Sequence, residues 1–243
     1  MKRLFAAACL LTASMLPAHA VTVSNGIVIF SQTDALAGNV TPGDAPGFPV
    51  TISGTGAYRL SGNLAVTPGV NGIEVTAPEV TLDFFGFRMT GATVSNRGVV
   101  GTNRALTVSN GTVRGFKFSG IESNSTQLTV NDMRVADNAG QGIFAPGTGA
   151  TIRNSEAFSN AVGISCGGGC LIEGNNILRN TVQGIALSGP DSMIFKNNIS
   201  LNGTGILMAS AASAGNNSII GNTISISGAA FKPMDPNACS PAC

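Results

Sequence analysis

The chain has 243 residues, of which only 10% are charged and 32 are glycine, and it contains no tryptophan. Its 13 Lys and Arg residues almost balance its 12 Asp and Glu residues. Nucleic-acid-binding surfaces depend on clustered cations, so the absence of a basic tract argues against nucleic acid as a partner. A chain of this length can bury one core and is expected to form one domain.

The first twenty residues have the pattern of a signal peptide. Lys2 and Arg3 are followed by an apolar run from Leu4 to Leu16 and by a small-x-small cleavage site that ends at Ala20. The apolar run is too short to span a bilayer. We expect a protein exported to the periplasm or the cell exterior, cleaved near Ala20, with no membrane span in the mature chain.

Residues 21–57 are expected to form an N-terminal strand and a capping segment. The stretch SQTDALAG, residues 31–38, has Ser31 at an N-cap position and Asp34 in the first turn. This pattern predicts a short helix. A helix at this point would cover the strand edges at the N-terminal end of the fold.

A Gly-Ile pair then recurs along the chain at a nearly constant interval. The pair lies at positions 120–121, 142–143, 163–164, 184–185 and 205–206. The stretches between the glycines are rich in β-branched residues and too short for helices, and Gly, Asn and Ser supply turns between them. A period of this length predicts a parallel β-helix, in which each strand pairs with its counterpart one period later.

We therefore predict an all-β fold: a right-handed, single-stranded parallel β-helix, a solenoid of about eight coils with a period of about 21–22 residues, over residues 58–228. The isoleucine after each glycine is expected to point inward. These residues would form one apolar column of Ile121, Ile143, Ile164, Ile185 and Ile206. One coil cannot shield its own apolar face, so stability requires several stacked coils.

Asparagine follows a similar period. Positions separated by one period hold Asn110, Asp132, Asn154, Asn176 and Asn198. We interpret this series as a structural ladder of side chains that hydrogen-bond along the axis, with the carboxylate of Asp132 accepting from its neighbours. A second series lies at turn positions shortly before the glycines, at Asn138, Asn160, Asn180 and Asn202.

Four cysteines remain after signal-peptide removal. An even number in an exported chain favours disulfides, and we favour Cys166–Cys170 and Cys239–Cys243 among the three possible pairings. A zinc site is disfavoured because no histidine remains beside the cysteines, so we expect no metal. Residues 229–243, with three prolines and two cysteines, are expected to form a tail that lies across the last coil or extends from it.

Residues 47–91, GFPVTISGTGAYRLSGNLAVTPGVNGIEVTAPEVTLDFFGFRMTG, resemble the entry region of exported bacterial right-handed parallel β-helix repeat proteins of the pectate-lyase-like superfamily. The matching residues are Tyr58, Leu60, Asn63, Leu64, Gly72, Ile73, Val75, Val80, Thr81, Leu82, Asp83, Gly86 and Phe87. Phe85 stands where the family usually has asparagine. The resemblance implies the fold but not the function, because such coils occur in pectate-lyase-like enzymes, epimerases, phage tailspikes and adhesins.

The candidate functional site consists of charged residues that coil stacking would bring together. Arg134 and Glu156 are one period apart, so they would lie one coil above the other, and we expect Asp132 and Arg153 close by. The structural interpretation is a cross-coil ion pair of about 0–1 kcal/mol. The functional interpretation is a small site for an anionic sugar or a cation on one face. Two further candidates on neighbouring turns are Glu122 and Asp137.

The sequence does not decide whether the protein is an enzyme, and it favours a non-catalytic role. The loops between coils are short, and no nucleophile motif such as Gly-x-Ser-x-Gly occurs. We predict a monomeric structural or polysaccharide-binding protein, without a cofactor, that presents a polar strand face.

Two alternatives remain open. The first is a small polysaccharide lyase or epimerase of the pectate-lyase-like class, which needs a base and either a cationic group or Ca²⁺ to neutralise the substrate carboxylate. The second is an adhesion or assembly module that pairs with another chain through an uncovered terminal coil.

Overall fold

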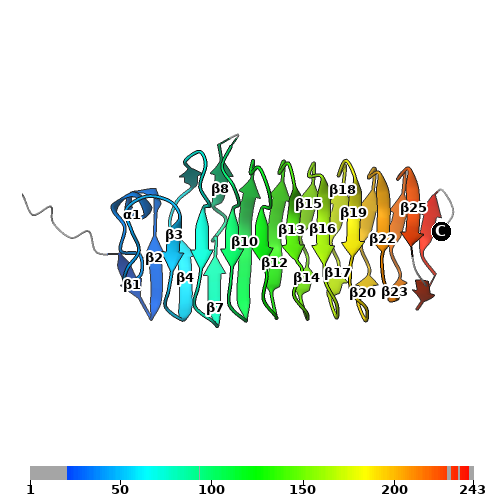
Figure 1. The fold of residues 1–243 in the computed structure, drawn as a ribbon, viewed down its shortest axis with the longest axis horizontal. Helices are drawn as coiled ribbons and strands as arrows, with labels where there is room; N and C mark the ends of the chain where they lie inside the picture. The colour runs from blue at the N-terminus through cyan, green and yellow to red at the C-terminus, as the bar shows by residue number, and fades with distance from the viewer. Residues whose placement is uncertain (1–20, 93, 229–230, 235, 241–243) are drawn as a thin grey trace, which may run out of the picture.

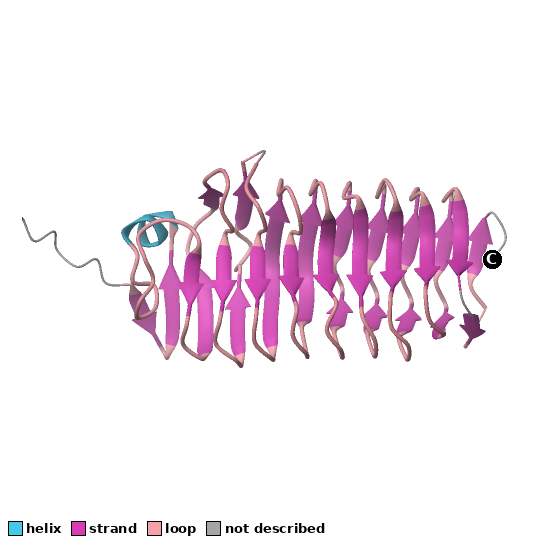
Figure 2. Cartoon of the chain, in the orientation of Figure 1, coloured by secondary structure: helices cyan, strands magenta, loops and turns pink. Residues whose placement is uncertain are grey.

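The computed structural model describes residues 21–92, 94–228, 231–234 and 236–240. The predicted signal peptide, residues 1–20, lies outside the described residues, as do parts of the predicted tail. The described chain winds into an elongated stack of coils made of short strands (Figure 1). One short helix, α1 (Gln32–Ala37), lies at the N-terminal end, and the other described elements are strands and turns (Figure 2).

The strands of successive coils lie in three columns, which we call faces 1, 2 and 3. Face 1 contains β2 (Ile27–Phe30), β4 (Gly56–Leu60), β7 (Val80–Asp83), the first parts of β10 (Leu106–Arg114) and β12 (Thr129–Ala136), β14 (Thr151–Arg153), β17 (Leu171–Glu173), β20 (Met193–Phe195), β23 (Ala212–Gly215) and β26 (Phe231–Pro233). Face 2 contains β5 (Leu64–Val66), β8 (Arg88–Gly91), the second parts of β10 and β12, β15 (Glu156–Phe158), β18 (Asn176–Leu178), β21 (Asn198–Ser200), β24 (Ser218–Ile220) and β27 (Ala238–Ser240).

Face 3 is a separate nine-stranded sheet. It contains β3 (Val50–Ile52), β6 (Ile73–Val75), β9 (Val99–Gly101), β11 (Ile121–Ser123), β13 (Gln141–Ala145), β16 (Val162–Cys166), β19 (Gln183–Leu187), β22 (Thr204–Met208) and β25 (Ile224–Gly228). Strand pairing along each face is parallel, and the antiparallel exception is β1 (Thr22–Ser24), which pairs with β2. The predicted all-β parallel β-helix, with about 8 turns and a repeat close to the predicted period, is confirmed.

Parallel pairing extends beyond the range 58–228 at both ends. At the N-terminal end β2 pairs with β4 and β3 pairs with β6. At the C-terminal end β26 and β27 pair with β23 and β24, so part of the segment expected to be a tail continues the coils. Pro233 lies in β26, which pairs with β23 along one edge. Proline has no backbone N–H to donate, and it is tolerated here because no described strand pairs with the other edge of β26.

The interior of the stack is apolar. Ile121, Ile143, Ile164, Ile185 and Ile206 lie in register on face 3. Each of these side chains is 0% exposed. Glycine precedes each isoleucine because the backbone of the next coil lies where a Cβ would stand: a Cβ on Gly184 would lie 2.7 Å from the carbonyl oxygen of Gly205.

Each coil turns three corners, and a residue with positive φ occurs at most of them. Between faces 1 and 2 these residues are Phe85, Asn110, Asp132, Asn154, Gly174, Lys196 and Asn216. Glycine, asparagine and aspartate adopt this left-handed conformation most readily. The recurrence of Asn110, Asp132 and Asn154 therefore reflects the corner geometry.

The prediction of one ladder from Asn110 through Asn154 to Asn198 is wrong. Strand pairing places Asn176 beside Glu156 and Glu156 beside Arg134. The coil from Glu156 to Asn176 contains fewer residues than the coil from Arg134 to Glu156. The corner position after Asn154 is therefore held by a glycine, Gly174. Asn176 and Asn198 instead lie within face 2, where the Nδ2 of Asn198 donates to the Oδ1 of Asn176 at 2.9 Å.

Two other series of side chains form the buried ladders. The first is the predicted series of Asn138, Asn160, Asn180 and Asn202, which continues to Asn222. The second consists of Ser155, Asn175, Asn197, Asn217 and Asn237. The Oδ1 of Asn180 accepts from the backbone N–H and the Nδ2 of Asn160 at 3.0 and 3.2 Å. Its Nδ2 donates to the carbonyl of Ala157 and to the Oδ1 of Asn202, both at 3.0 Å. The buried amides of the two series thus bond to the coils on either side of them.

The N-terminal end is closed by a capped helix, which confirms the helix prediction. Ser31 is the N-cap of α1, and its side chain accepts from the backbone N–H of Asp34 while Asp34 accepts from the backbone N–H of Ser31. After the helix, buried Asp44 ties the chain to face 3. Its two carboxylate oxygens accept from the backbone N–H groups of Thr51 and Val40 at 2.6 and 3.1 Å.

Cys166 and Cys170 form a disulfide between β16 and β17, and each is 1% exposed. Cys166 lies in register with Ala145 and Leu187, so it occupies a core position that apolar side chains fill in the adjacent coils. Cys239 is also disulfide-bonded, while Cys243 lies outside the described residues.

We predict that Asn180→Ala lowers the free energy of unfolding by about 3 kcal/mol, because it leaves the buried N–H of Asn160 without its acceptor. Asn198→Ala is the matched control. It removes an asparagine that recurs at a similar interval but has an exposed side chain. We expect the free energy of unfolding to fall by less than about 1 kcal/mol. Denaturant unfolding measures both values, and equal losses would contradict the assignment of the ladders.

Asp44 predicts a pH dependence of stability. Burial raises the pKa of Asp44 above its ordinary value of 3.8, and the two backbone hydrogen bonds oppose that shift. The native state therefore binds this proton more tightly than the unfolded chain does. The contribution of Asp44 to the free energy of unfolding is greatest below pH 3.8. This contribution falls as the pH rises through the raised native pKa. The difference in unfolding free energy between the wild type and Asp44→Asn should decrease over this window, and an increase contradicts the prediction.

Candidate functional site

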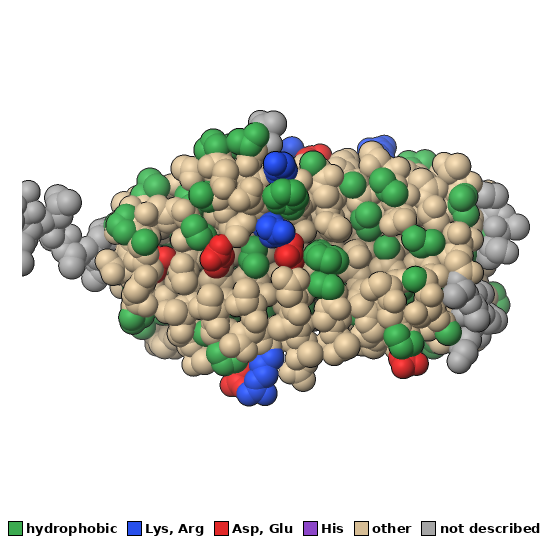
Figure 3. All heavy atoms as spheres, viewed as in Figure 1, with side chains coloured by type: hydrophobic (Ala, Val, Ile, Leu, Met, Phe, Trp, Pro, Cys, Tyr) green, Lys and Arg blue, Asp and Glu red, His purple; other side chains and the backbone are tan. Residues whose placement is uncertain are grey.

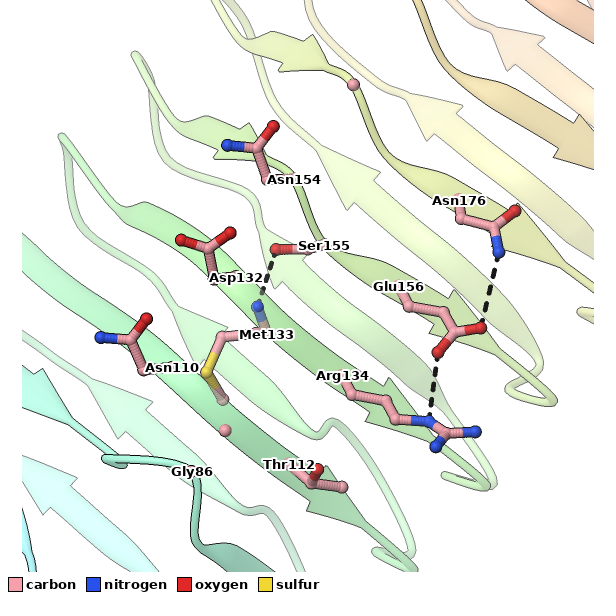
Figure 4. Close-up of a pocket in the computed structure, with 12 residues that line it drawn as sticks. Gly86, Asn110, Thr112, Asp132, Met133, Arg134, Asn154, Ser155, Glu156 and Asn176 are labelled. Carbon is pink, nitrogen blue, oxygen red and sulfur yellow. Dashed lines mark hydrogen bonds and ion pairs between the residues drawn. The ribbon is translucent and has the colours of Figure 1, made fainter.

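A shallow depression of about 520 Å³ runs along the axis over face 2 and the corner that it shares with face 1. The side chains that line it come from five successive coils, from the corner before β8 to β18. The lining residues are Gly86, Asn110, Gly111, Thr112, Asp132, Met133, Arg134, Asn154, Ser155, Glu156, Gly174 and Asn176. Figure 4 shows how they are arranged on the neighbouring strands.

The alternation of strand side chains creates two outward columns on face 2. Strand register defines the first column as Arg88, Thr112, Arg134, Glu156, Asn176, Asn198 and Ser218. The second column is Thr90, Arg114, Ala136, Phe158, Leu178, Ser200 and Ile220. Because parallel strands are about 4.8 Å apart, each column presents one side chain per coil at that spacing.

The structure brings three of the four predicted site residues to the depression. The Nε of Arg134 lies 3.1 Å from the Oε2 of Glu156, and the other Glu156 oxygen accepts from the Nδ2 of Asn176 at 3.5 Å (Figure 4). Asp132 lines the same depression at the corner, where its carboxylate accepts from the Nδ2 of Asn131. The guanidinium of Arg134 also lies over the ring of Phe158, at 4.6 Å from its centroid.

Arg153 does not join this group. It lies at the end of β14 on face 1, where it pairs with Glu173 at 3.2 Å. The corner at Asn154 separates it from Glu156, so the two side chains project from different faces. Arg153 lines a second depression of about 430 Å³ over face 1, together with Thr129 and Thr151. Strand register places Arg153 beside Asn131, the neighbour of Asp132, but Arg153 does not line the depression that holds the other three candidates.

A pocket of about 270 Å³ adjoins the depression and is not anticipated from the sequence. Three arginines line it: Arg88, Arg114 and Arg134. Arg114 pairs with Asp137 at 2.7 Å, whereas the side chain of Arg88 makes no ion pair or hydrogen bond with any described residue. We call the pocket that these three side chains line the arginine pocket.

A search at a constant period misses the arginine pocket. Strand pairing places Arg88 beside Thr112, which is a longer step along the chain than the next one, from Thr112 to Arg134. The step is longer because the chain from Arg88 to Val99, which links β8 to β9, has more residues than the corresponding chain from Thr112 to Ile121. Arg114 lies in the second outward column rather than directly above either neighbour. The alternation of strand side chains is the signal that could have grouped the arginines.

Of the two further acidic candidates, Asp137 lies beside the arginine pocket, where it pairs with Arg114, and Glu122 lies outside the depression. Glu122 is on face 3, where it is 6% exposed and its Oε2 accepts from the Nε of Arg97 at 2.6 Å and from the Oγ of Ser119 at 3.0 Å. On the side of the stack visible in Figure 3, charged side chains are few and are scattered among polar and apolar ones. Glu122 is therefore paired on face 3, away from the depression over face 2.

Neither a metal-binding cluster nor a membrane-spanning helix is found in the described part of the chain. No group of three or more His, Cys, Asp or Glu side chains there is placed to hold a metal ion. No helix among the described residues has the length and apolar character needed to cross a membrane.

Comparison with known proteins supports the architecture. The family described as "Right handed beta helix region" matches residues 97–235. No curated protein matches the chain. A solved structure, the enzymatically active domain of tailspike protein 2 of bacteriophage CBA120, superposes with a TM-score of 0.58 at 16% identity, over 74% of this chain and 36% of that chain. The chain thus spans about a third of the tailspike domain, and the likeness concerns the fold.

Two epimerase modules superpose less well. The A-module of the Azotobacter vinelandii mannuronan C-5 epimerase AlgE4 has a TM-score of 0.45 at 15% identity, over 81% of this chain and 67% of that chain. The A-module of AlgE6 from the same organism has a TM-score of 0.43 at 12% identity, over 88% of this chain and 89% of that chain.

We predict a small coupling energy between Arg134 and Glu156. Both side chains are partly solvated, at 57% and 34% exposure, so water and salt screen the pair. A double-mutant cycle with Arg134→Ala and Glu156→Ala should give less than about 1 kcal/mol, and this value should fall as salt is added. A salt-independent coupling above about 2 kcal/mol would contradict a solvent-screened pair.

Proposed function

Because the chain belongs to the family of right-handed β-helix proteins, we propose that it is an exported, non-catalytic protein that binds polysaccharide along face 2. The observation that carries this proposal is the depression that runs with the axis across five coils. A linear glycan repeats along its length, and a pyranose unit advances the chain by about the coil spacing of roughly 4.8 Å. Successive sugars can therefore contact equivalent positions on successive coils.

The chemistry of the lining suits a glycan. The first outward column offers hydroxyl, guanidinium, carboxylate and amide groups from Thr112 to Asn198, and these groups donate to and accept from sugar hydroxyls. The second column adds apolar surface at Phe158, Leu178 and Ile220. A strip of polar groups beside a strip of apolar groups fits a sugar ring, which has polar edges and less polar faces.

The contacts of the carboxylates support a binding role rather than catalysis. Glu156 is paired with Arg134 and also accepts from Asn176, and Asp132 accepts from Asn131. A general base that abstracts a proton beside a sugar carboxylate must be within hydrogen-bond reach of that proton. Both carboxylates are already held by neighbouring side chains.

Export is supported by the N-terminal sequence pattern and by the buried Cys166–Cys170 disulfide. Disulfides persist in oxidising compartments such as the periplasm and the cell exterior. N-terminal sequencing of the secreted protein tests this part of the proposal. A mature N-terminus near Ala20 supports it, and an uncleaved protein retained in the cytoplasm contradicts it.

The alternative is a small polysaccharide lyase or epimerase. It is favoured by the presence of Asp132, Arg134 and Glu156 in one depression. Incubation of the purified protein with uronate polymers, with and without Ca²⁺, separates the two functions. Ultraviolet absorbance of unsaturated sugars detects a lyase, and NMR of the polymer detects an epimerase. Turnover that Glu156→Gln abolishes would establish the alternative and overturn the non-catalytic role.

We predict that Thr112→Trp abolishes glycan binding, because its indole would fill the part of the depression over β10. Thr129→Trp is the matched control, since Thr129 is an outward threonine on face 1. Both proteins are screened on a glycan array with and without Ca²⁺. Binding that survives Thr112→Trp, or that is lost equally in Thr129→Trp, would place the glycan away from face 2.

A further inference from the structure

The arginine pocket carries one unbalanced positive charge. It contains three guanidinium groups, which remain charged at any physiological pH. Arg114 is paired with Asp137 at 2.7 Å and Arg134 is paired with Glu156 at 3.1 Å, so two carboxylates neutralise two of the three cations. The guanidinium of Arg88 is the remaining one, and no described residue pairs with it.

The pocket spans three successive coils. Arg88 lies on β8, Arg114 on β10 and Arg134 on β12. A volume of about 270 Å³ holds one small acid group. Arginine forks bind the oxygens of carboxylate and sulfate groups through paired hydrogen bonds. The charge balance and the size together fit a single monovalent acid group.

Face 2 changes character on the C-terminal side of the pocket. From β15 to β24 the first outward column continues as Glu156, Asn176, Asn198 and Ser218. No Lys or Arg stands in either outward column over these described strands. The nearest cations are at the corners: Lys196 lies over the ring of Phe195 on face 1, and Arg179 lies at the corner toward face 3.

A ligand that lies along face 2 therefore meets a cationic pocket, then a carboxylate, then amides and a hydroxyl. A second acid group close to the first would lie over Glu156, whose charge is already matched by Arg134, so it would find no unpaired cation there. Farther along, an acid group would lose water without gaining a cation. Neutral sugars make hydrogen bonds with Asn176, Asn198 and Ser218 at no such cost.

We propose that the ligand is a heteropolysaccharide in which a singly charged acid group, a uronate carboxylate or a sulfate half-ester, is separated from the next by neutral sugars. The arginine pocket holds the acid group, and the amide stretch of face 2 holds the neutral sugars. This inference rests on the proposed glycan binding to face 2. It selects against homopolyuronates, in which every sugar is charged.

The test compares four probes by titration calorimetry at physiological salt. Fragments of deacylated gellan carry glucuronates separated by neutral sugars, and carboxyl-reduced gellan is their neutral counterpart. Polygalacturonate is the homopolyuronate, and a sparsely sulfated neutral glucan presents isolated sulfates. We expect the gellan fragments to bind at least about tenfold more tightly than carboxyl-reduced gellan or polygalacturonate.

Arg88→Gln is the test variant and Arg179→Gln the matched control. Both remove one exposed arginine near face 2, but only Arg88 lines the arginine pocket. Arg88→Gln should weaken gellan binding about tenfold and leave carboxyl-reduced gellan unaffected, whereas Arg179→Gln should change neither. Tight binding of the sulfated glucan that also depends on Arg88 would identify sulfate as the acid group.

Three results would overturn this inference. Polygalacturonate could bind as tightly as gellan, both arginine variants could weaken binding equally, or carboxyl-reduced gellan could bind as well as gellan. If carboxyl-reduced gellan binds as well as gellan and Thr112→Trp abolishes this binding, the proposed glycan binding to face 2 stands and only the selectivity for an acid group is lost. Failure of every probe, together with an empty glycan array, would instead remove the proposed function, and this inference with it.

Discussion

The buried asparagine ladders are the interaction on which the rest of the structure depends. Each ladder amide at a corner, such as Asn160 or Asn180, bonds to the coil before it and the coil after it. A buried amide without partners costs about 1–3 kcal/mol, so a coil displaced by one residue would lose these bonds at two corners at once. The ladders therefore fix the register, and the isoleucine column supplies the apolar burial that makes this register stable.

Fixed register has a direct consequence on the outer surface. When the inward side chains of neighbouring strands are aligned, the outward side chains are aligned as well. Thr112, Arg134, Glu156 and Asn176 come from four different coils, yet they form one column along the depression. The fold therefore builds an extended surface from short strands without long loops. Its chemistry changes along the axis only because the residue at each repeat position changes.

The inward side of this design is easier to predict from the sequence than the outward side. Ile121 and its counterparts can be found because burial restricts their position to β-branched apolar residues and the interval between them is nearly constant. Asn176 falls into the wrong series because the coil from Glu156 to Asn176 is shorter than the coil before it, and a fixed period cannot reveal a short coil. Arg88 and Arg114 escape prediction because surface positions tolerate many residue types. Their proximity depends on the long connection between β8 and β9 and on the alternation of strand side chains.

The central claim is that aligned coils present one ligand-binding column along the axis. A crystal structure of the mature protein with a bound gellan fragment tests it most directly. The account predicts a glycan that runs parallel to the axis over face 2, advances about one sugar per coil, and has its glucuronate carboxylate among Arg88, Arg114 and Arg134. A glycan that crosses the strands of a single coil, or that lies on face 1 or face 3, would contradict the account.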